Sequence, residues 1–162
     1  MSLIVHIRRA KPSDIPTIIE YNLAHAKEIE GLQLNEDVLR LGVENALKRK
    51  ECHYFVAESD GNVIGQTMIT YEWSDWRNGV IWWLQSIYVK PDYRKQGVFK
   101  AIFHHIETLA KNDPQIKALR LYVMKNNQSG KSAYKKLGMN NSNYIVYDKE
   151  FFIDEFQVGR WV

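Results

Sequence analysis

The stretch Ile87–Lys100, which reads IYVKPDYRKQGVFK, decides the fold of this chain. It begins with the end of an apolar run, and Lys90-Pro91 closes that run. After Gly97 the apolar residues recur at helical spacing, at Val98, Phe99, Ile102, Phe103, Ile106 and Leu109. The pattern predicts a strand, a short basic turn and then a helix.

The turn between the predicted strand and helix has the features of an anion-binding site. The first N–H groups of a helix lack intrahelical partners and carry the positive end of the helix dipole. Gly97 lets the backbone approach a phosphate closely, and Arg94, Lys95 and Lys100 add positive charge. For such a turn taken alone, the alternative is an ordinary connection with solvated basic residues.

Length and composition indicate a globular protein and exclude several classes. With 162 residues, of which 45% are hydrophobic and 25% charged, the chain fits a single domain, 1–162. The net charge of +3 suits an anionic small molecule and is low for a nucleic-acid-binding protein. No apolar run is long enough to cross a membrane, so we expect neither nucleic acid nor membrane as a partner.

The single cysteine, Cys52, excludes an internal disulfide and fits a reducing compartment, so we expect the protein in the cytoplasm. Cys52 precedes a predicted strand and is expected to be a buried thiol. The Cys and His residues show no spacing typical of a metal site, and the adjacent pair His104-His105 points in different directions on a helix. We therefore expect no metal.

The rest of the chain predicts an alternation of strands and helices. The expected strands are residues 3–9, 53–58, 63–71, 80–89, 119–123 and 144–147. The expected helices begin near Pro12, Asn35, Val98 and Ser129. The run from Val80 to Val89 is almost wholly apolar, as in a strand covered on both faces. A right-handed unit over residues 80–121 places the basic turn at the carboxyl end of a central strand.

A second motif is Asn127–Met139, which reads NQSGKSAYKKLGM. Asn127 and Ser129 are natural helix-capping residues, Tyr134 lies within the helix, and Gly138 is placed to end it. On its own this is a short amphipathic helix with good ends.

With both motifs in this order, the chain resembles the GCN5-related N-acetyltransferase (GNAT) superfamily. The resemblance covers nearly the whole chain, from the opening IRRAKPSDIPTI through a hairpin at Asp60-Gly61 to the two motifs. It implies an α/β fold (α+β in some schemes): a mixed, largely antiparallel central sheet with a splayed, parallel-like strand pair and about four helices. It also implies an N-acetyltransferase that moves the acetyl group of acetyl-CoA directly, through a tetrahedral intermediate, to a primary amine of a small molecule or peptide.

The phosphate-binding motif of the superfamily is Gln or Arg, two residues, Gly, one residue, and then Gly or Ala. Arg94–Val98 matches this motif, whereas Phe99 occupies the last position. The resemblance implies that the N–H groups from Gln96 to Lys100, including that of Phe99, hold the pyrophosphate of the cofactor.

The resemblance also assigns the remainder of the cofactor site. Backbone groups of Ile87 and Val89 are expected to bind the pantetheine arm, with Tyr88 between them. Asn127 and Ser129 are expected to contact the cofactor where the next strand splays away, and Tyr134 is expected near the sulfur.

Acetyl transfer to an amine makes three demands. A lysine-like amine, with a pKa near ~10.4, must lose a proton; the charge on the carbonyl oxygen must be stabilised; and the departing thiolate should be protonated. The resemblance favours Tyr134 as general acid, although a packing role is the alternative. A backbone N–H at Tyr88 is the candidate oxyanion donor.

The general base is not evident from the sequence. Many members of the superfamily carry a glutamate on the strand that here reads Trp83-Leu84-Gln85-Ser86. Glu72 is the candidate base upstream, with Asp75 beside it, and a solvated surface role is the alternative for both. A third alternative is an ordered water that Gln85 and Ser86 position.

Four of the five tryptophans lie in Tyr71–Trp83, which reads YEWSDWRNGVIWW. One interpretation is an aromatic wall for an ammonium group, with Trp73, Asp75, Trp76 and Gln85 as substrate residues. In the other, Trp82 and Trp83 are core residues, and Trp73 and Trp76 close a loop or a dimer contact.

Two further hypotheses belong to other classes. The missing strand carboxylate and Phe99 would fit a non-catalytic domain that binds acyl-CoA or another protein, and nucleic-acid binding is a distant third. The C-terminal residues Phe151, Phe152, Phe156 and Trp161 are apolar for a free tail. They either pack against the domain or pair with a second subunit, which would make a homodimer.

Overall fold

The computed structural model describes residues 3–149 and 151, and its centre is a mixed five-stranded sheet. The strands, in their spatial order, are β1 (His6–Arg9), β2 (Cys52–Ser59), β3 (Asn62–Ser74), β4 (Gly79–Val89) and β5 (Ile116–Leu121). The first four strands pair antiparallel, and β5 pairs parallel to β4. The expected sheet, with a single parallel pair, is confirmed.

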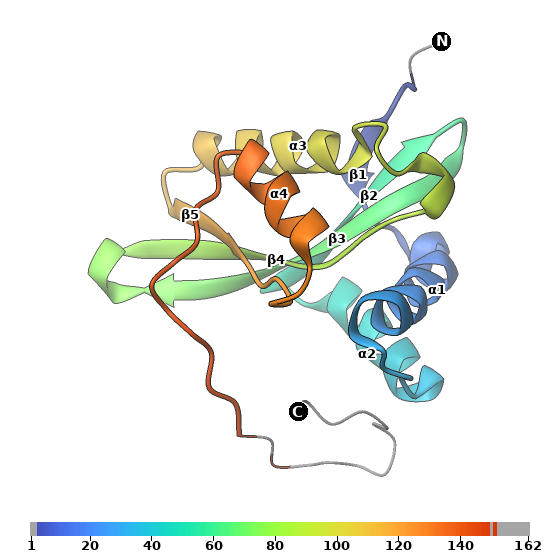
Figure 1. Cartoon of the computed structure of the whole chain (residues 1–162), viewed down its shortest axis with the longest axis horizontal. Coiled ribbons are helices and arrows are strands. Elements are labelled where there is room, and N and C mark those ends of the chain that lie inside the picture. The colour runs from blue at the N-terminus through green and yellow to red at the C-terminus, as the bar shows by residue number, and fades with distance from the viewer. Residues whose placement is uncertain (1–2, 150, 152–162) are drawn as a thin grey trace.

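Four α-helices cover the two faces of this sheet. They are α1 (Ile15–His25), α2 (Glu36–Lys48), α3 (Val98–Asn112) and α4 (Gln128–Lys136). Figure 1 shows α3 on one face of the sheet and α1 with α2 on the other. Helix α1 runs on into one π-helical turn, Ala26–Glu30, which Gly31 ends with a φ of 67°. Within residues 3–149 no helix combines the length and apolar character that a membrane crossing requires.

Side-chain alternation along the strands divides the buried residues between two clusters. On the α3 side, Phe55, Ile69 and Leu84 of the sheet pack with helix residues that include Ile102 and Ile106. On the other side, the sheet residues Tyr54 and Val56 pack with Ile18 of α1 and Val43 of α2. Cys52 is buried in this second cluster, as expected.

One predicted strand is wrong. Residues 144–147 form no strand, and their side chains are exposed. Their sequence, Tyr-Ile-Val-Tyr, has high strand propensity, but propensity becomes structure only where a partner strand supplies hydrogen bonds and packing. In the described part of the chain no strand pairs with these residues.

Two other expectations change in detail. Strand β5 is predicted at residues 119–123. It begins three residues earlier, at Ile116, and ends at Leu121. Strand β4 is not buried along its whole length, because residues that include Trp83 and Gln85 to Ile87 are half-exposed. Phe151 is exposed, and the expected contacts of Phe152, Phe156 and Trp161 lie outside the described residues.

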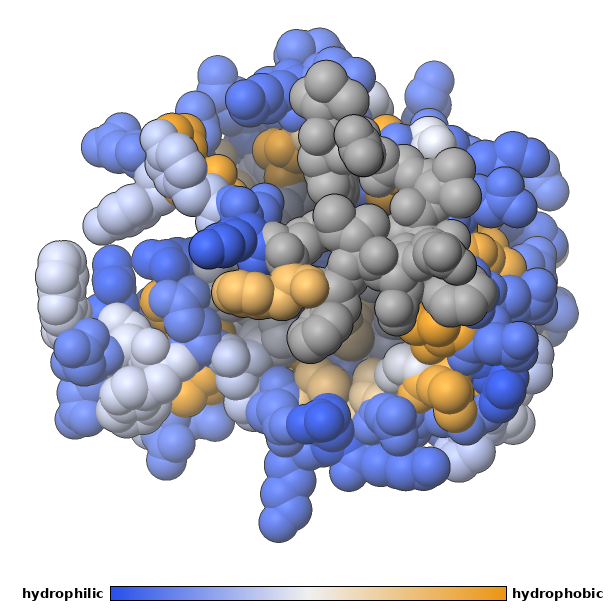
Figure 2. Space-filling model, turned by 90° about the horizontal axis from the view of Figure 1, so that it is seen from below, coloured by the Kyte–Doolittle hydropathy of each residue, from blue (hydrophilic) through white to orange (hydrophobic). Residues whose placement is uncertain are grey.

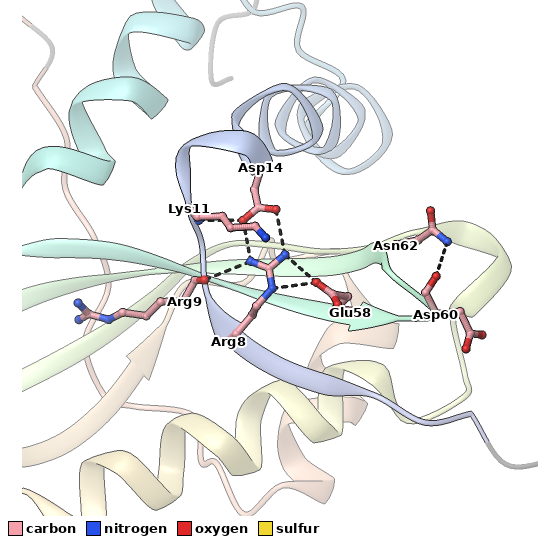
Figure 3. Close-up of polar contacts among 7 residues, drawn as sticks. All are labelled: Arg8, Arg9, Lys11, Asp14, Glu58, Asp60 and Asn62. Carbon is pink, nitrogen blue, oxygen red and sulfur yellow. Dashed lines mark hydrogen bonds and ion pairs between the residues drawn. The ribbon is translucent and has the colours of Figure 1, made fainter.

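An arginine clamp, formed by Arg8 with Asp14 and Glu58, joins β1 to β2 and to the start of α1 (Figure 3). The Arg8 guanidinium of β1 donates to both carboxylate oxygens of Asp14, at 2.7 and 3.0 Å, and to Glu58 of β2 at 2.8 Å. Burial alone would raise the pKa of the Asp14 carboxyl, but the hydrogen bonds from Arg8 and the Lys11 N–H lower it below its ordinary value. The clamp fixes the entry into α1.

We predict that Arg8→Gln lowers the free energy of unfolding by about 2 kcal/mol near neutral pH, because a charged hydrogen bond to a buried carboxylate is lost. Since the pKa of Asp14 is lowered in the folded state, its contribution is present above the unfolded pKa and is lost as the pH falls. Urea unfolding at several pH values measures this effect. The difference between wild type and variant should shrink between about pH 5 and about pH 2.

The matched control is Arg40→Gln on α2, whose pairs with Asp37 and Glu44 are exposed, at 3.5 and 3.4 Å. It should change stability by less than about 0.5 kcal/mol. Equal effects of the two variants would contradict the role given to the clamp.

Candidate active site

The parallel strands β4 and β5 separate part-way along their length. They pair from Val80 opposite Ile116 to Leu84 opposite Leu121, where β5 ends. Strand β4 continues to Val89. Beyond Leu84 the free edge of β4, from Gln85 to Val89, therefore has no strand beside it in the described part of the chain. We call the space beside this edge the β4–β5 opening.

A β-bulge lies at the start of the β4–β5 opening. Gln66 of β3 pairs with Tyr88, and Met68 pairs with Gln85, so Ser86 and Ile87 together face the single residue between them on β3. Ser86 has a φ of 50°, in the left-handed region that a residue with a side chain seldom adopts. A bulge of this kind re-aims the groups that follow it.

Three consecutive carbonyls at the bulge are bound by side chains. The Thr67 hydroxyl donates to the carbonyl of Gln85 at 2.9 Å, and the Gln66 amide donates to that of Ser86 at 3.3 Å. His25 Nδ1 of α1 lies 2.9 Å from the carbonyl of Ile87. Because each carbonyl has a partner, the bulge has one defined orientation.

The N–H groups of Ile87 and Val89 face the β4–β5 opening. The Lys90 N–H donates to Ile64 of β3 at 2.9 Å, and the Tyr88 carbonyl lies 3.1 Å from the position of a Cβ on Gly65. Successive backbone groups of a strand point to opposite edges. Tyr88 and Lys90 therefore face β3, and Ile87 and Val89 face away. The backbone donor expected at Tyr88 is thus directed at β3, and its two neighbours replace it as candidates.

The turn into α3 has the geometry of an anion site. Lys95 has a φ of 61° and Gly97 a φ of 86°, so the backbone N–H groups before α3 depart from a regular course. The first turn of α3 carries no acidic residue. A Cβ on Gly97 would have no atom within 4 Å, so the space beside it is open. These features fit the pyrophosphate group of a cofactor.

Two residues of the phosphate motif have their side chains engaged within the protein. The Arg94 guanidinium donates to the Val89 carbonyl at 2.9 Å and to Glu28 at 2.6 Å. Phe99 is half-buried, and its ring lies edge-on to that of Tyr134, with centroids 5.6 Å apart. The departure at Phe99 thus leaves the backbone N–H in place and adds a packing surface for Tyr134.

Tyr134 on α4 is half-buried, and burial raises its pKa. Its hydroxyl makes no hydrogen bond to another described residue. Helix α4 is held in place by Asn127, whose Oδ1 accepts the Gly130 N–H at 2.8 Å, while Ser129 is exposed in the first turn. Leu137, just after the helix, packs against the α3-side cluster.

Glu72 lies far from the bulge. It pairs with Ile81, five residues before Ser86, which is roughly 17 Å along β4 at about 3.3 Å per residue. Its carboxylate accepts the indole N–H of Trp83 and lies 3.3 Å from Arg120. These contacts and this distance argue against Glu72 as a direct base.

The other residues of the tryptophan-rich stretch are divided by the structure. Trp73, Asp75 and Trp76 lie at the turn of the β3–β4 hairpin, which projects to the left in Figure 1, farther still from the bulge. The side chains of Trp73 and Trp76 are 63% and 86% exposed. They therefore lie apart from the β4–β5 opening of the same chain. Trp82 is a core residue, as the second interpretation had it, whereas Trp83, which it also placed in the core, is half-exposed.

Gln85 is the one expected substrate residue that lies at the bulge. Its amide donates to the Thr70 hydroxyl at 2.6 Å, and its side chain is half-buried. The structure adds residues that the sequence analysis missed: His25, Glu28 and Glu30, at the end of α1 and in the π-helical turn. His25 follows Asn22 by three positions and so lies on the buried face of α1, but no local pattern marked it.

The comparison with protein families decides the identity of this fold. Residues 20–139 match the acetyltransferase (GNAT) family. The chain belongs to this family. Thialysine N-epsilon-acetyltransferase of Bos taurus is 30% identical to it over an alignment of 145 positions that covers 83% of each chain.

Solved structures of acetyltransferases have the same fold as this chain. A possible acetyltransferase from Clostridium difficile 630 is 40% identical and superposes with a TM-score of 0.86, over 92% of this chain and 99% of the other. A predicted acetyltransferase from Clostridium acetobutylicum with acetyl-CoA shares the fold, at 20% identity and a TM-score of 0.74 over 90% and 96% of the two chains.

The expected acetyl-CoA-dependent N-acetyltransferase is thereby confirmed, and the hypothesis of a non-catalytic domain loses its support. The site fits acetyl-CoA, because backbone N–H donors line both the β4–β5 opening and the turn into α3. Within residues 3–149 no three side chains of His, Cys, Asp or Glu gather into a metal site.

We predict that Gly97→Ala weakens acetyl-CoA binding at least about tenfold, because the new Cβ enters the open space beside the first N–H groups of α3. The positive φ adds a strain of about 1 kcal/mol to the folded state. Isothermal titration calorimetry measures the binding, and thermal unfolding measures the strain.

Gly61→Ala is the matched control, because Gly61 has a φ of 75° and equally open surroundings in the β2–β3 turn. It should lose similar stability and bind acetyl-CoA like the wild type. Equal affinities for all three proteins would place the pyrophosphate elsewhere.

Proposed function

We propose that this enzyme acetylates the primary amine of a small, lysine-like molecule. The observation that carries the proposal is the pair of N–H groups, of Ile87 and Val89, that face the β4–β5 opening, while Tyr134 packs on Phe99 at the start of α3. The curated bovine relative is named for the ε-amine of thialysine, which supports a small aliphatic amine over a peptide as acceptor.

The site residues take the following roles in this proposal. The strand edge at Ile87 and Val89 holds the pantetheine arm, and the Ile87 N–H is the oxyanion donor, since Ile87 lies in the bulge itself. The N–H groups from Gln96 to Lys100 hold the pyrophosphate, as the open geometry at Gly97 supports. Asn127 and Ser129 border the cofactor at the start of α4. Bound acetyl-CoA supplies the activated acetyl thioester.

Tyr134 is the general acid of the proposed reaction. A phenol whose pKa is raised by burial keeps its proton at neutral pH. Such a proton is available to a thiolate as it departs, which is typically worth two to four orders of magnitude in rate. The edge contact with Phe99 fixes the direction of the Tyr134 ring.

The face of the molecule on which α1 and α2 lie is largely polar. Figure 2 shows the molecule from below the view of Figure 1, the side on which α1 and α2 lie, and the coloured surface is mostly hydrophilic with apolar residues in small groups. We also propose that residues 1–162 form one acetyltransferase domain, that it works in the cytoplasm, and that nucleic acid and membranes are not its partners. A homodimer through the exposed Trp73 and Trp76 is an expectation of the same kind.

A thiol-release assay with acetyl-CoA tests the proposed function. Lysine-like amino acids and short diamines should release free CoA, whereas amines within folded proteins should release little. Release with peptides alone, or with no amine at all, would contradict the proposal.

We predict that Tyr134→Phe lowers kcat by about 10²–10⁴-fold and leaves the acetyl-CoA dissociation constant within about twofold, because only proton donation is lost. Steady-state kinetics and calorimetry on the same preparations measure the two quantities.

Tyr71→Phe is the matched control. Tyr71 of β3 stacks on Trp82 of β4, away from the β4–β5 opening. It should keep the wild-type kcat. A Tyr134→Phe variant that turns over normally would give Tyr134 a packing role.

A further inference from the structure

The end of α1 and the π-helical turn bring titratable side chains to the bulge. His25 Nδ1 lies 2.9 Å from the Ile87 carbonyl, and its Nε2 lies 3.8 Å from Glu30 Oε1. Glu28 of the same turn accepts the Tyr88 hydroxyl at 3.0 Å. A histidine and two carboxylates thus lie next to the proposed oxyanion donor, on the α1 side of the sheet.

The contact with Ile87 sets the tautomer of His25. A backbone carbonyl can only accept a hydrogen bond, so Nδ1 must carry the proton. In the neutral ring the lone pair is then on Nε2, which points toward Glu30. Imidazole is the side chain that most readily exchanges protons near neutral pH, and here the bulge itself orients it.

The space between His25 and Glu30 fits an ammonium group. At 3.8 Å the two side chains are too far apart for a hydrogen bond with each other. An ammonium nitrogen can lie between them, about 2.9 Å from both Nε2 and Oε1, and both of these distances are ordinary hydrogen-bond lengths. The two side chains are 25% and 26% exposed, so they are half-buried and still reachable from solvent.

Glu28 is engaged otherwise, which distinguishes it from Glu30. Its carboxylate accepts Arg94 at 2.6 Å as well as Tyr88. Burial raises the pKa of Glu28, but these two hydrogen bonds outweigh burial and lower it. In the described part of the chain, the only charged partner of the Glu30 carboxylate is His25.

We propose that His25 is the general base and that Glu30 binds the ammonium group of the acceptor. The proposal rests on the proposed function and deepens it, since it places the acceptor amine on the α1 side of the bulge. It also selects acceptors, because a carboxylate beside a proton-accepting nitrogen favours amines that arrive protonated.

The proton and electron balance of the step is as follows. Nε2 of His25 takes one proton from the ammonium, and the free amine nitrogen attacks the thioester carbonyl carbon. The C–N bond forms, the C–S bond breaks, and the sulfur leaves with the bonding pair. Tyr134 gives the sulfur a proton and regains one from the second N–H of the amine through water. His25 returns its proton to solvent, which leaves the acetamide and free CoA.

The charged and titratable groups around His25 are known from the elements packed against it. They are Glu28 and Glu30 of the π-helical turn, Tyr88 of β4, Arg94 of the turn before α3, and Tyr21 one helical turn earlier in α1. Arg94 is paired with Glu28, so the face toward the acceptor is dominated by Glu30.

The pH dependence of kcat in His25→Gln tests the proposal. Glutamine can still donate to the Ile87 carbonyl, so the bulge is retained while the base is lost. We expect kcat to fall about 10²–10³-fold near neutral pH, with acetyl-CoA affinity and melting temperature close to wild type. The wild-type profile should have an acidic limb near neutral pH, which in the variant is replaced by a rise toward the pKa of the amine, so the deficit should shrink near pH 10, where water alone deprotonates the amine.

Two further variants separate the roles. Glu30→Gln should raise the KM for the amine about tenfold or more and change kcat less. His104→Gln is the matched control, since His104 is exposed on α3 on the other side of the sheet, and it should behave as wild type.

Each outcome decides for or against the proposal. A His25→Gln variant with wild-type kcat and the same acidic limb would overturn it, while thiol release by the wild type would leave the proposed function standing. Should His25→Gln fail to fold, a wild type without an acidic limb, or an unchanged KM in Glu30→Gln, would overturn it equally. A wild type that releases no thiol with any amine would instead contradict the proposed function.

Discussion

At the bulge of β4 three backbone carbonyls lose the partners that a regular ladder would give them, and three side chains replace those partners. A fully buried carbonyl without a partner costs about 1–3 kcal/mol, and a half-exposed one costs less, so the bonds from Thr67, Gln66 and His25 stabilise the irregular strand. Gln66 is fully buried and also donates to Asn22 of α1 at 3.0 Å. The same contacts therefore hold α1 against the sheet and aim the backbone of the active site.

The position of the other functional elements follows from this arrangement. Because β5 ends where β4 begins to bulge, one edge of β4 is left free for a strand-like ligand. The turn into α3 follows β4 directly, so its unpaired N–H groups lie at the end of that edge. Helix α4 then returns with Tyr134 against Phe99. The proposed sites for the cofactor and the oxyanion are thus formed by backbone geometry, whereas the proposed acid is the Tyr134 side chain, which Phe99 positions.

The sequence was sufficient for the family and for most of the fold, because these depend on local signals, and the cofactor residues that we propose come from the same signals. The strand, the glycine at positive φ and the helix periodicity of Ile87–Lys100 are all visible in the sequence. The proposed base was not visible there, because His25 and Ile87 are 62 residues apart and meet only through packing of α1 on β4. Glu72 shows the converse case: it is near the active strand in sequence, yet it lies roughly 17 Å along that strand from the bulge, at about 3.3 Å per residue. The strand expected at residues 144–147 shows the same limit, since propensity cannot supply a partner.

The most direct measurement is an NMR titration of the ¹⁵N-labelled protein with CoA, which follows each backbone amide. The account predicts that the amides of Ile87, Val89 and the residues from Gln96 to Lys100 shift strongly, and that Trp73 and Trp76 at the hairpin turn do not. Large shifts at the hairpin turn, with Ile87 and Val89 unchanged, would contradict the claim that the β4 bulge presents its backbone to the cofactor.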